Sequence, residues 1–171
     1  GITLHVLEAG FESAGRGCVV LVHGFPELAY SWRKQLLPLA GAGYHVIAPD
    51  LRGYGRSCGT GIVFDDDLYP FTILNHVADV VGIVRTFGYE KADAVVGHDF
   101  GSSVAAWCAL IRPDVFSSLV MMSAPFGGPP ELPPGSLKQA SAGRDVYEEL
   151  AHLPRPRKHY HKYYATREAN D

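Results

Sequence analysis

The residue best suited to chemistry in this sequence is Asp99, which lies between two glycines in the segment Gly97–Gly101 (GHDFG). An apolar run before the segment predicts a strand, and the run Ser102 to Ile111 predicts a helix. A sharp strand-to-helix turn with glycines on both sides of one residue holds that side chain up at the end of a sheet. The segment is therefore typical of a nucleophile, here a carboxylate in the usual position of serine, although an aspartate capping the helix would give the same residues.

A carboxylate nucleophile suits some reactions and not others. Acyl transfer to it yields a high-energy anhydride, whereas displacement at an sp³ carbon yields an ordinary ester. Asp99 therefore argues against lipase, esterase and peptidase activity and favours alkyl transfer from an epoxide or an alkyl halide. The ester would then be hydrolysed by water that a general base activates, with backbone N–H groups stabilising the negative oxygen at the Asp99 carbonyl.

Two further motifs precede Asp99 in the chain. They are His23–Glu27 (HGFPE) and the glycine-rich Asp50–Ser57 (DLRGYGRS), and each follows a short apolar run expected for a strand buried on both faces. Three motifs in this order, each after a strand, rarely arise by chance. The expected oxyanion hole consists of the backbone N–H groups of Phe25 and Phe100.

Predicted strands and helices alternate before Pro125. We expect strands at Ile2 to Glu8, Cys18 to Val22, His45 to Ala48, Ala92 to Val96 and Ser118 to Ser123. We expect helices at Ser31 to Ala42, Thr72 to Phe87 and Ser102 to Ile111. The second helix is amphipathic, with Asn75, Asp79 and Arg85 expected on its polar side. This alternation predicts an α/β fold with a mostly parallel sheet.

The three motifs together resemble the epoxide hydrolase branch of the α/β-hydrolase superfamily, and the match runs over almost the whole chain. The resemblance implies the α/β-hydrolase fold, with flanking helices, a cis peptide bond before Pro26 and a helical cap inserted after the sixth core strand. Five of the twelve prolines lie between Pro125 and Pro134, where that cap would begin. We therefore assign residues 1–127 to the hydrolase core and 128–171 to the start of the cap.

The resemblance also implies an enzyme that opens an epoxide to a vicinal diol through an ester on Asp99, using water and no cofactor or metal. It implies two cap tyrosines that hydrogen-bond the epoxide oxygen. Family spacing favours Tyr160 as the first, with Tyr163 and Tyr164 as alternatives; packing of these aromatic rings against the core is an equally weighted interpretation. Dehalogenases usually place a tryptophan or an arginine directly after the nucleophile, whereas Phe100 has no side-chain donor.

Four further residues within or near the motifs are assigned supporting roles. Pro26 and Trp32 are expected to line the substrate pocket, although a tryptophan at a helix start is more often a core residue. His23 is expected to brace the oxyanion loop by hydrogen bonds. His98 is expected to point away from the nucleophile and to support the turn.

The composition excludes several kinds of partner. The chain has 171 residues, 47% of them hydrophobic, and a net charge of -3, which gives no electrostatic reason to bind nucleic acid or an anionic membrane. No apolar run is long enough to span a bilayer. Its three cysteines have no metal-type spacing and fit a reducing, cytoplasmic setting.

Some expected parts of such an enzyme are missing. After Asp99 we find no credible general-base histidine, no acid partner for it, no second cap tyrosine and no late core strands. We therefore expect a fragment or a truncated relative, whose apolar sheet edge the rest of the same protein would complete. Two alternatives remain open at this point: a haloalkane or haloacid dehalogenase, and a non-catalytic α/β-hydrolase-like module.

Overall fold

The computed structural model describes residues 2–13, 15, 17–128, 146–157 and 159–169. It divides the chain into two compact units. The first unit comprises Gly1–Ile62 and Asp67–Phe126, and the second comprises Val63–Asp66 and Gly127–Asp171.

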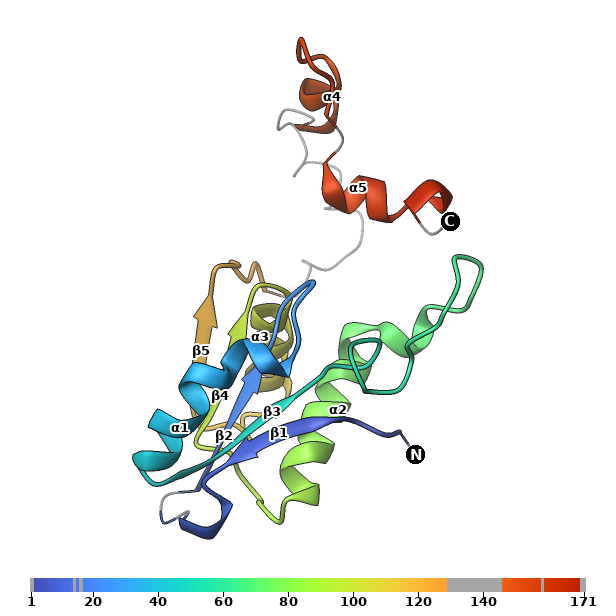
Figure 1. The fold of residues 1–171 in the computed structure, drawn as a ribbon. Coiled ribbons are helices and arrows are strands. Elements are labelled where there is room, and N and C mark those ends of the chain that lie inside the picture. Colours follow the sequence, from blue (N-terminus) through green and yellow to red (C-terminus); the bar gives the residue numbers. More distant parts are fainter. Residues whose placement is uncertain (1, 14, 16, 129–145, 158, 170–171) are drawn as a thin grey trace. The chain divides into compact units, whose positions relative to one another are not determined.

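The first unit is built on a five-stranded sheet in the order β1-β3-β2-β4-β5 (Figure 1). The strands are β1 (Val6–Ala9), β2 (Gly17–Val22), β3 (Tyr44–Pro49), β4 (Ala94–His98) and β5 (Leu119–Met122). β1 pairs antiparallel with β3, and the other pairs are parallel. The predicted α/β fold with a mostly parallel sheet is confirmed. Because parallel strands end at the same edge, the segments that follow β2, β3 and β4 meet there.

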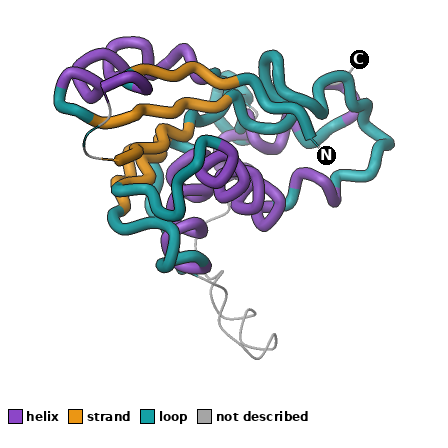
Figure 2. The backbone as a smooth tube through the Cα atoms, turned by 90° about the horizontal axis from the view of Figure 1, so that it is seen from below, coloured by secondary structure: helices purple, strands orange, loops and turns teal. Residues whose placement is uncertain are grey.

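Helices cover both faces of this sheet (Figure 2). Alternate residues of β2 pack on one side against α2 (Ile73–Thr86) and α3 (Phe100–Ile111). The residues between them pack on the other side with Trp32, which directly precedes α1 (Arg33–Gly41), and with Leu36 of that helix. Since strand side chains alternate between faces, a strand covered on both sides must be apolar throughout, as this one is.

The structure corrects three details of the expected elements. β1 begins at Val6 rather than at Ile2, and the first expected helix opens with a 3-10 turn, Ala29–Trp32, before α1. The third correction is Asp79, which is buried rather than exposed on the polar side of α2. Its carboxylate accepts hydrogen bonds from Nε and Nη2 of Arg52, both at 2.5 Å, because a buried carboxylate needs a charged partner.

The expected apolar sheet edge is present at β5. All four of its residues are 38–46% exposed. Such an edge is a template for pairing with further chain.

The second unit contains α4 (Val146–Ala151), α5 (Tyr160–Tyr164) and a 3-10 turn, Arg167–Ala169. Nη2 of Arg167 donates a hydrogen bond to Oδ1 of Asp65 at 2.6 Å, and the guanidinium lies over the ring of Phe64. These two contacts join the two segments of this unit. Residues 129–145 of the expected cap lie outside the described residues, and the cap assignment stays a prediction. Among the described helices, none combines the length and the apolar character needed to cross a membrane.

Candidate active site

Asp99 lies in the sharp turn between β4 and α3. Its φ of 53° and ψ of -122° put a non-glycine residue in a strained region of backbone space. The neighbouring glycines are required by contact: a Cβ at Gly97 would collide with the carbonyl of Gly101, and a Cβ at Gly101 would collide with the carbonyl of Val22. The predicted nucleophile turn is therefore formed, with Asp99 raised at the carboxyl edge of the sheet.

Ser102 links this turn to β5 by hydrogen bonds. Its hydroxyl is fully buried, accepts from the N–H of Met122 at 3.0 Å and lies 2.8 Å from the carbonyls of Gly97 and Met122. The N–H of Asp99 donates to the same Met122 carbonyl at 3.0 Å. The turn is thus bonded to β5 both through the N–H of Asp99 and through the hydroxyl of Ser102.

The loop His23–Ala29, called the donor loop below, brings one backbone donor to the Asp99 carboxylate. The N–H of Phe25 donates to Asp99 Oδ1 at 2.9 Å. The Phe25–Pro26 peptide bond is cis, as the resemblance implied. A Cβ at Gly24 would lie 2.5 Å from Asp99 Cβ, so only glycine allows this approach. One carboxylate oxygen therefore already occupies the position in which an oxyanion would be stabilised.

His23 braces the donor loop, as expected. It is fully buried, its Nε2 accepts from the N–H of Leu51 at 2.9 Å, and its Nδ1 lies 2.8 Å from the carbonyl of Gly24. Since Nε2 accepts, the proton must be on Nδ1, which donates to Gly24. Burial lowers the pKa of His23, which favours this neutral form.

The second expected donor, the N–H of Phe100, is at the first residue of α3. Its role at Asp99 stays a prediction. The Phe100 ring packs edge-on against buried His76, with ring centroids 5.3 Å apart. A phenyl ring offers no N–H to a leaving group.

Sequence reasoning missed two residues near Asp99. Tyr54 packs its ring on His23 at 4.9 Å, and its pKa is raised by burial and, secondarily, by the charge of Asp99. Glu27 pairs with Nδ1 of His98 at 3.0 Å. A tyrosine within a glycine-rich turn and a glutamate after a proline carry no local signal of such contacts.

Trp32 is only 6% exposed and packs in the core on the α1 side of the sheet. It also lines a small hollow of about 180 Å³ beside the nucleophile turn, together with Glu27, Ser31, Gln35, His98 and Met122. Core packing and lining a hollow are thus both observed for this tryptophan. Substrate contact by Trp32 or by the exposed Pro26 stays a prediction.

The three candidate tyrosines lie on or at the end of α5 in the second unit. Tyr160 and Tyr164 are exposed and Tyr163 is half-buried. Tyr160 stacks on His159, with centroids 4.9 Å apart and the rings inclined by 21°. Their roles toward substrate stay predictions.

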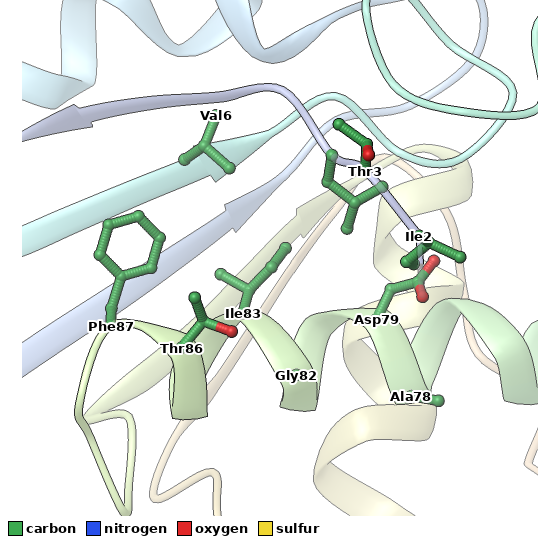
Figure 3. A pocket seen from close by; sticks show the side chains of 10 residues that line it. Ile2, Thr3, Val6, Ala78, Asp79, Gly82, Ile83, Thr86 and Phe87 are labelled. Atoms are coloured by element: carbon green, nitrogen blue, oxygen red, sulfur yellow. The ribbon is translucent and has the colours of Figure 1, made fainter.

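A larger groove of about 560 Å³ lies elsewhere, between residues 2–6 and one face of α2 (Figure 3). Its walls are mostly apolar, with the Arg52-bound Asp79 as its charged group. None of the motif residues around Asp99 lines it. Within the described ranges, no cluster of His, Cys, Asp and Glu is arranged to hold a metal ion.

Comparisons with known proteins agree with this geometry. Residues 17–166 match the family model for the alpha/beta hydrolase fold. The chain is 40% identical over 147 residues to epoxide hydrolase A of Mycobacterium tuberculosis, covering 86% of this chain and 43% of that protein. It is 46% identical over 129 residues to epoxide hydrolase 3 of Siraitia grosvenorii, covering 74% and 37%. A solved epoxide hydrolase from an endophytic Streptomyces superposes with a TM-score of 0.70 at 38% identity, covering 95% of this chain and 43% of that one. The chain thus spans about two fifths of the length of these relatives.

Proposed function

The chain belongs to the α/β-hydrolase fold family, and on this premise we propose that the whole protein is an epoxide hydrolase that forms a transient ester on Asp99. The observation that carries the proposal is an aspartate at the nucleophile turn with one of its oxygens bonded to a backbone N–H. A carboxylate there suits attack on an sp³ carbon. The similarity to epoxide hydrolases supports the same substrate class, a small-molecule epoxide.

In the first step, Asp99 attacks an epoxide carbon and the carbon–oxygen bond of the ring breaks. Because Phe25 holds Oδ1, the other oxygen, Oδ2, forms the ester bond. The epoxide oxygen leaves as an alkoxide and takes a proton from an acid, for which we propose Tyr160, with Tyr163 and Tyr164 as alternatives. Pro26 and Trp32 are proposed to line the substrate pocket.

In the second step, water adds to the ester carbonyl carbon of Asp99 while a general base takes its proton. Negative charge develops on Oδ1, where Phe25 already donates and where we propose Phe100 as the second donor. Loss of one such donor typically costs about 10²- to 10³-fold in rate. Collapse breaks the bond between Cγ and Oδ2, and the leaving diol oxygen takes the proton that the base removed from water. The carboxylic acid left on Asp99 returns its proton to the tyrosine that acted as acid in the first step, which regenerates the carboxylate. We expect the base and its acid partner to lie outside residues 1–171. Neither step uses a metal or a cofactor.

The way the leaving group is stabilised distinguishes an epoxide hydrolase from a dehalogenase. A halide ion is stabilised by weak N–H donors, and the side chain after the nucleophile, Phe100, packs a phenyl ring against His76 instead. An alkoxide takes a proton and has no need of such a donor. Phe100 therefore favours the epoxide.

Isotope labelling tests the proposal. In ¹⁸O-labelled water, the full-length protein in excess over substrate should give a first-turnover diol that is mostly unlabelled, since its new oxygen comes from Asp99. With substrate in excess instead, later turnovers should carry label, and Asp99→Ala should form neither ester nor diol. Label in the first-turnover diol would overturn the mechanism. Halide release without diol formation would indicate the dehalogenase, and no turnover of either substrate class would indicate a non-catalytic module.

We further propose a cytoplasmic location. Cys18 and Cys108 are free and buried, and burial raises the pKa of each thiol to about 12. Thiols kept as small core residues suit a reducing compartment. Fractionation of the native cells, with the protein found outside the cytoplasmic fraction, would contradict this.

A further inference from the structure

The donor loop is anchored at both ends by the segment Asp50–Ser57, called the glycine-rich loop here. At one end, the N–H of Leu51 donates to His23 Nε2 at 2.9 Å. At the other, the N–H of Ala29 donates to Asp50 Oδ1 at 2.8 Å. Both contacts are buried, and Phe25 lies between them in the chain. The backbone N–H of Phe25, which faces Asp99, thus lies in a segment that is hydrogen-bonded to the glycine-rich loop on both sides.

The His23 anchor controls the direction of the Phe25 N–H. That N–H and the carbonyl of Gly24 belong to one peptide group, which is planar and trans, so they point in opposite directions. The carbonyl is held by His23 Nδ1 at 2.8 Å and by the N–H of Glu27 at 2.9 Å. With the carbonyl fixed, the N–H can only face Asp99.

The Asp50 anchor is itself rigid. Asp50 is 3% exposed, and its Oδ2 accepts from the N–H of Arg56 at 3.2 Å and pairs with His5 Nδ1 at 3.0 Å. A Cβ at Gly55 would collide with this carboxylate, so the backbone of the glycine-rich loop closes around it. Hydrogen bonds to an ionised acceptor are about twice as strong as neutral ones, which makes this carboxylate a firm attachment for Ala29.

From these contacts we propose that Asp50 and His23 are positioning residues that aim the Phe25 N–H at Asp99 Oδ1. The inference rests on the proposed function and deepens it. In ester formation, negative charge leaves the Asp99 carboxylate, whereas in ester hydrolysis it develops on Oδ1. A misaimed N–H therefore slows hydrolysis more than ester formation.

The decisive measurement is the pair of single-turnover rate constants in the full-length protein. Ester formation and ester decay are followed by rapid quenching and intact mass. Asp50→Asn replaces one acceptor oxygen by an NH₂ group that cannot accept. Hydrolysis should slow by roughly ten- to a hundredfold, because moving a positioned group by about 1 Å can cost about a hundredfold in rate. Ester formation should change by less than about threefold, because the Phe25 N–H is needed less in that step. The ester should accumulate.

Asp79→Asn is the matched control. Asp79 is another buried carboxylate and holds the same glycine-rich loop through Arg52, but among the described residues it makes no hydrogen bond to the donor loop. It should lower the free energy of unfolding without changing the ratio of the two rate constants. The inference is overturned if Asp50→Asn leaves that ratio unchanged, or shifts it no more than Asp79→Asn does.

A second pair of variants covers the case in which Asp50→Asn does not fold. His5 is partly exposed, so His5→Ala should be tolerated while it removes one partner of Asp50. Hydrolysis should slow a few-fold, and His5→Asn, whose amide NH₂ can replace Nδ1, should restore it. Equal rates in wild type and His5→Ala would overturn the inference. If the wild type forms no ester at all, the proposed function fails instead, so the two failures are distinguishable.

Discussion

Replacing Gly24 with alanine should separate the donor loop from the nucleophile. The new Cβ would lie 2.5 Å from Asp99 Cβ, 2.7 Å from the carbonyl oxygen of His98 and 2.9 Å from Asp99 Oδ1. Carbon atoms normally approach to about 3.5–4.0 Å, so one side must move by about 1 Å. The hydrogen bond from Phe25 to Oδ1, now 2.9 Å, would lengthen to about 3.9 Å, beyond the range of a hydrogen bond.

The expected consequence is kinetic. Loss of one donor to a developing oxyanion costs about 10²- to 10³-fold, so ester hydrolysis in Gly24→Ala should fall by that factor. Overpacking of this kind also costs about 1–3 kcal/mol of the free energy of unfolding. Single-turnover rates by rapid quench and urea unfolding would measure both effects in the full-length protein.

Gly82→Ala is the control for adding a methyl group. Gly82 is inside α2, and beyond its chain neighbours and the backbone of that helix no atom lies within 4 Å of a Cβ built there. It should leave both rate constants unchanged and raise the free energy of unfolding by up to about 1 kcal/mol, since alanine favours helix over glycine. Wild-type hydrolysis in Gly24→Ala, in a folded protein, would refute the geometry derived for the donor loop.

Three other predictions concern stability and reactivity. Arg52→Ala leaves Asp79 buried without its charged partner, so the free energy of unfolding should fall by about 3–5 kcal/mol in urea titrations, and an unchanged value would contradict the buried pair. Of the three thiols, Cys58 alone should react with maleimide in the folded protein, whereas all three should react in denaturant; a second label on the folded protein would contradict the burial of the others. Burial lowers the pKa of His23 and of His76 below 6.5, so the unfolded chain binds protons first on acidification. Stability should therefore be complete above about pH 6.5 and decline below it by up to about 1.4 kcal/mol per pH unit for each histidine, and a flat denaturation profile from pH 6.5 to 5 would refute this.

The nucleophile turn and the donor loop could be predicted because their constraints are local. A residue forced to positive φ needs glycine neighbours that tolerate close contact, and GHDFG displays that need within five residues. The same holds for the strands, since burial on both faces requires an unbroken apolar run. Phe25 could be proposed as a donor because the HGFPE segment resembles the oxyanion loop of α/β-hydrolases. Its N–H does bond Asp99 Oδ1 at 2.9 Å, and its role toward an oxyanion stays a prediction.

The burial and the partners of the carboxylates could not be predicted, because the residues that bond them are distant in the chain. Helical periodicity put Asp79 on the polar side of α2, but Arg52, 27 positions earlier, reaches it and makes burial tolerable. Asp50 opens a recognisable motif, yet nothing local shows that it bonds Ala29, 21 positions away, or His5, 45 positions away. A pattern within one element cannot distinguish a solvated carboxylate from a buried one.

The identity of the nucleophile depends on one residue, whereas the aim of its donor depends on contacts between three separate segments, around His5, the donor loop and the glycine-rich loop. A relative could therefore keep the GHDFG and HGFPE segments and still differ in the balance of its two steps, if the residue at position 50 changed. The ratio of ester hydrolysis to ester formation should consequently follow position 50 more closely than it follows the residues of the nucleophile turn that do not touch Asp99 Oδ1.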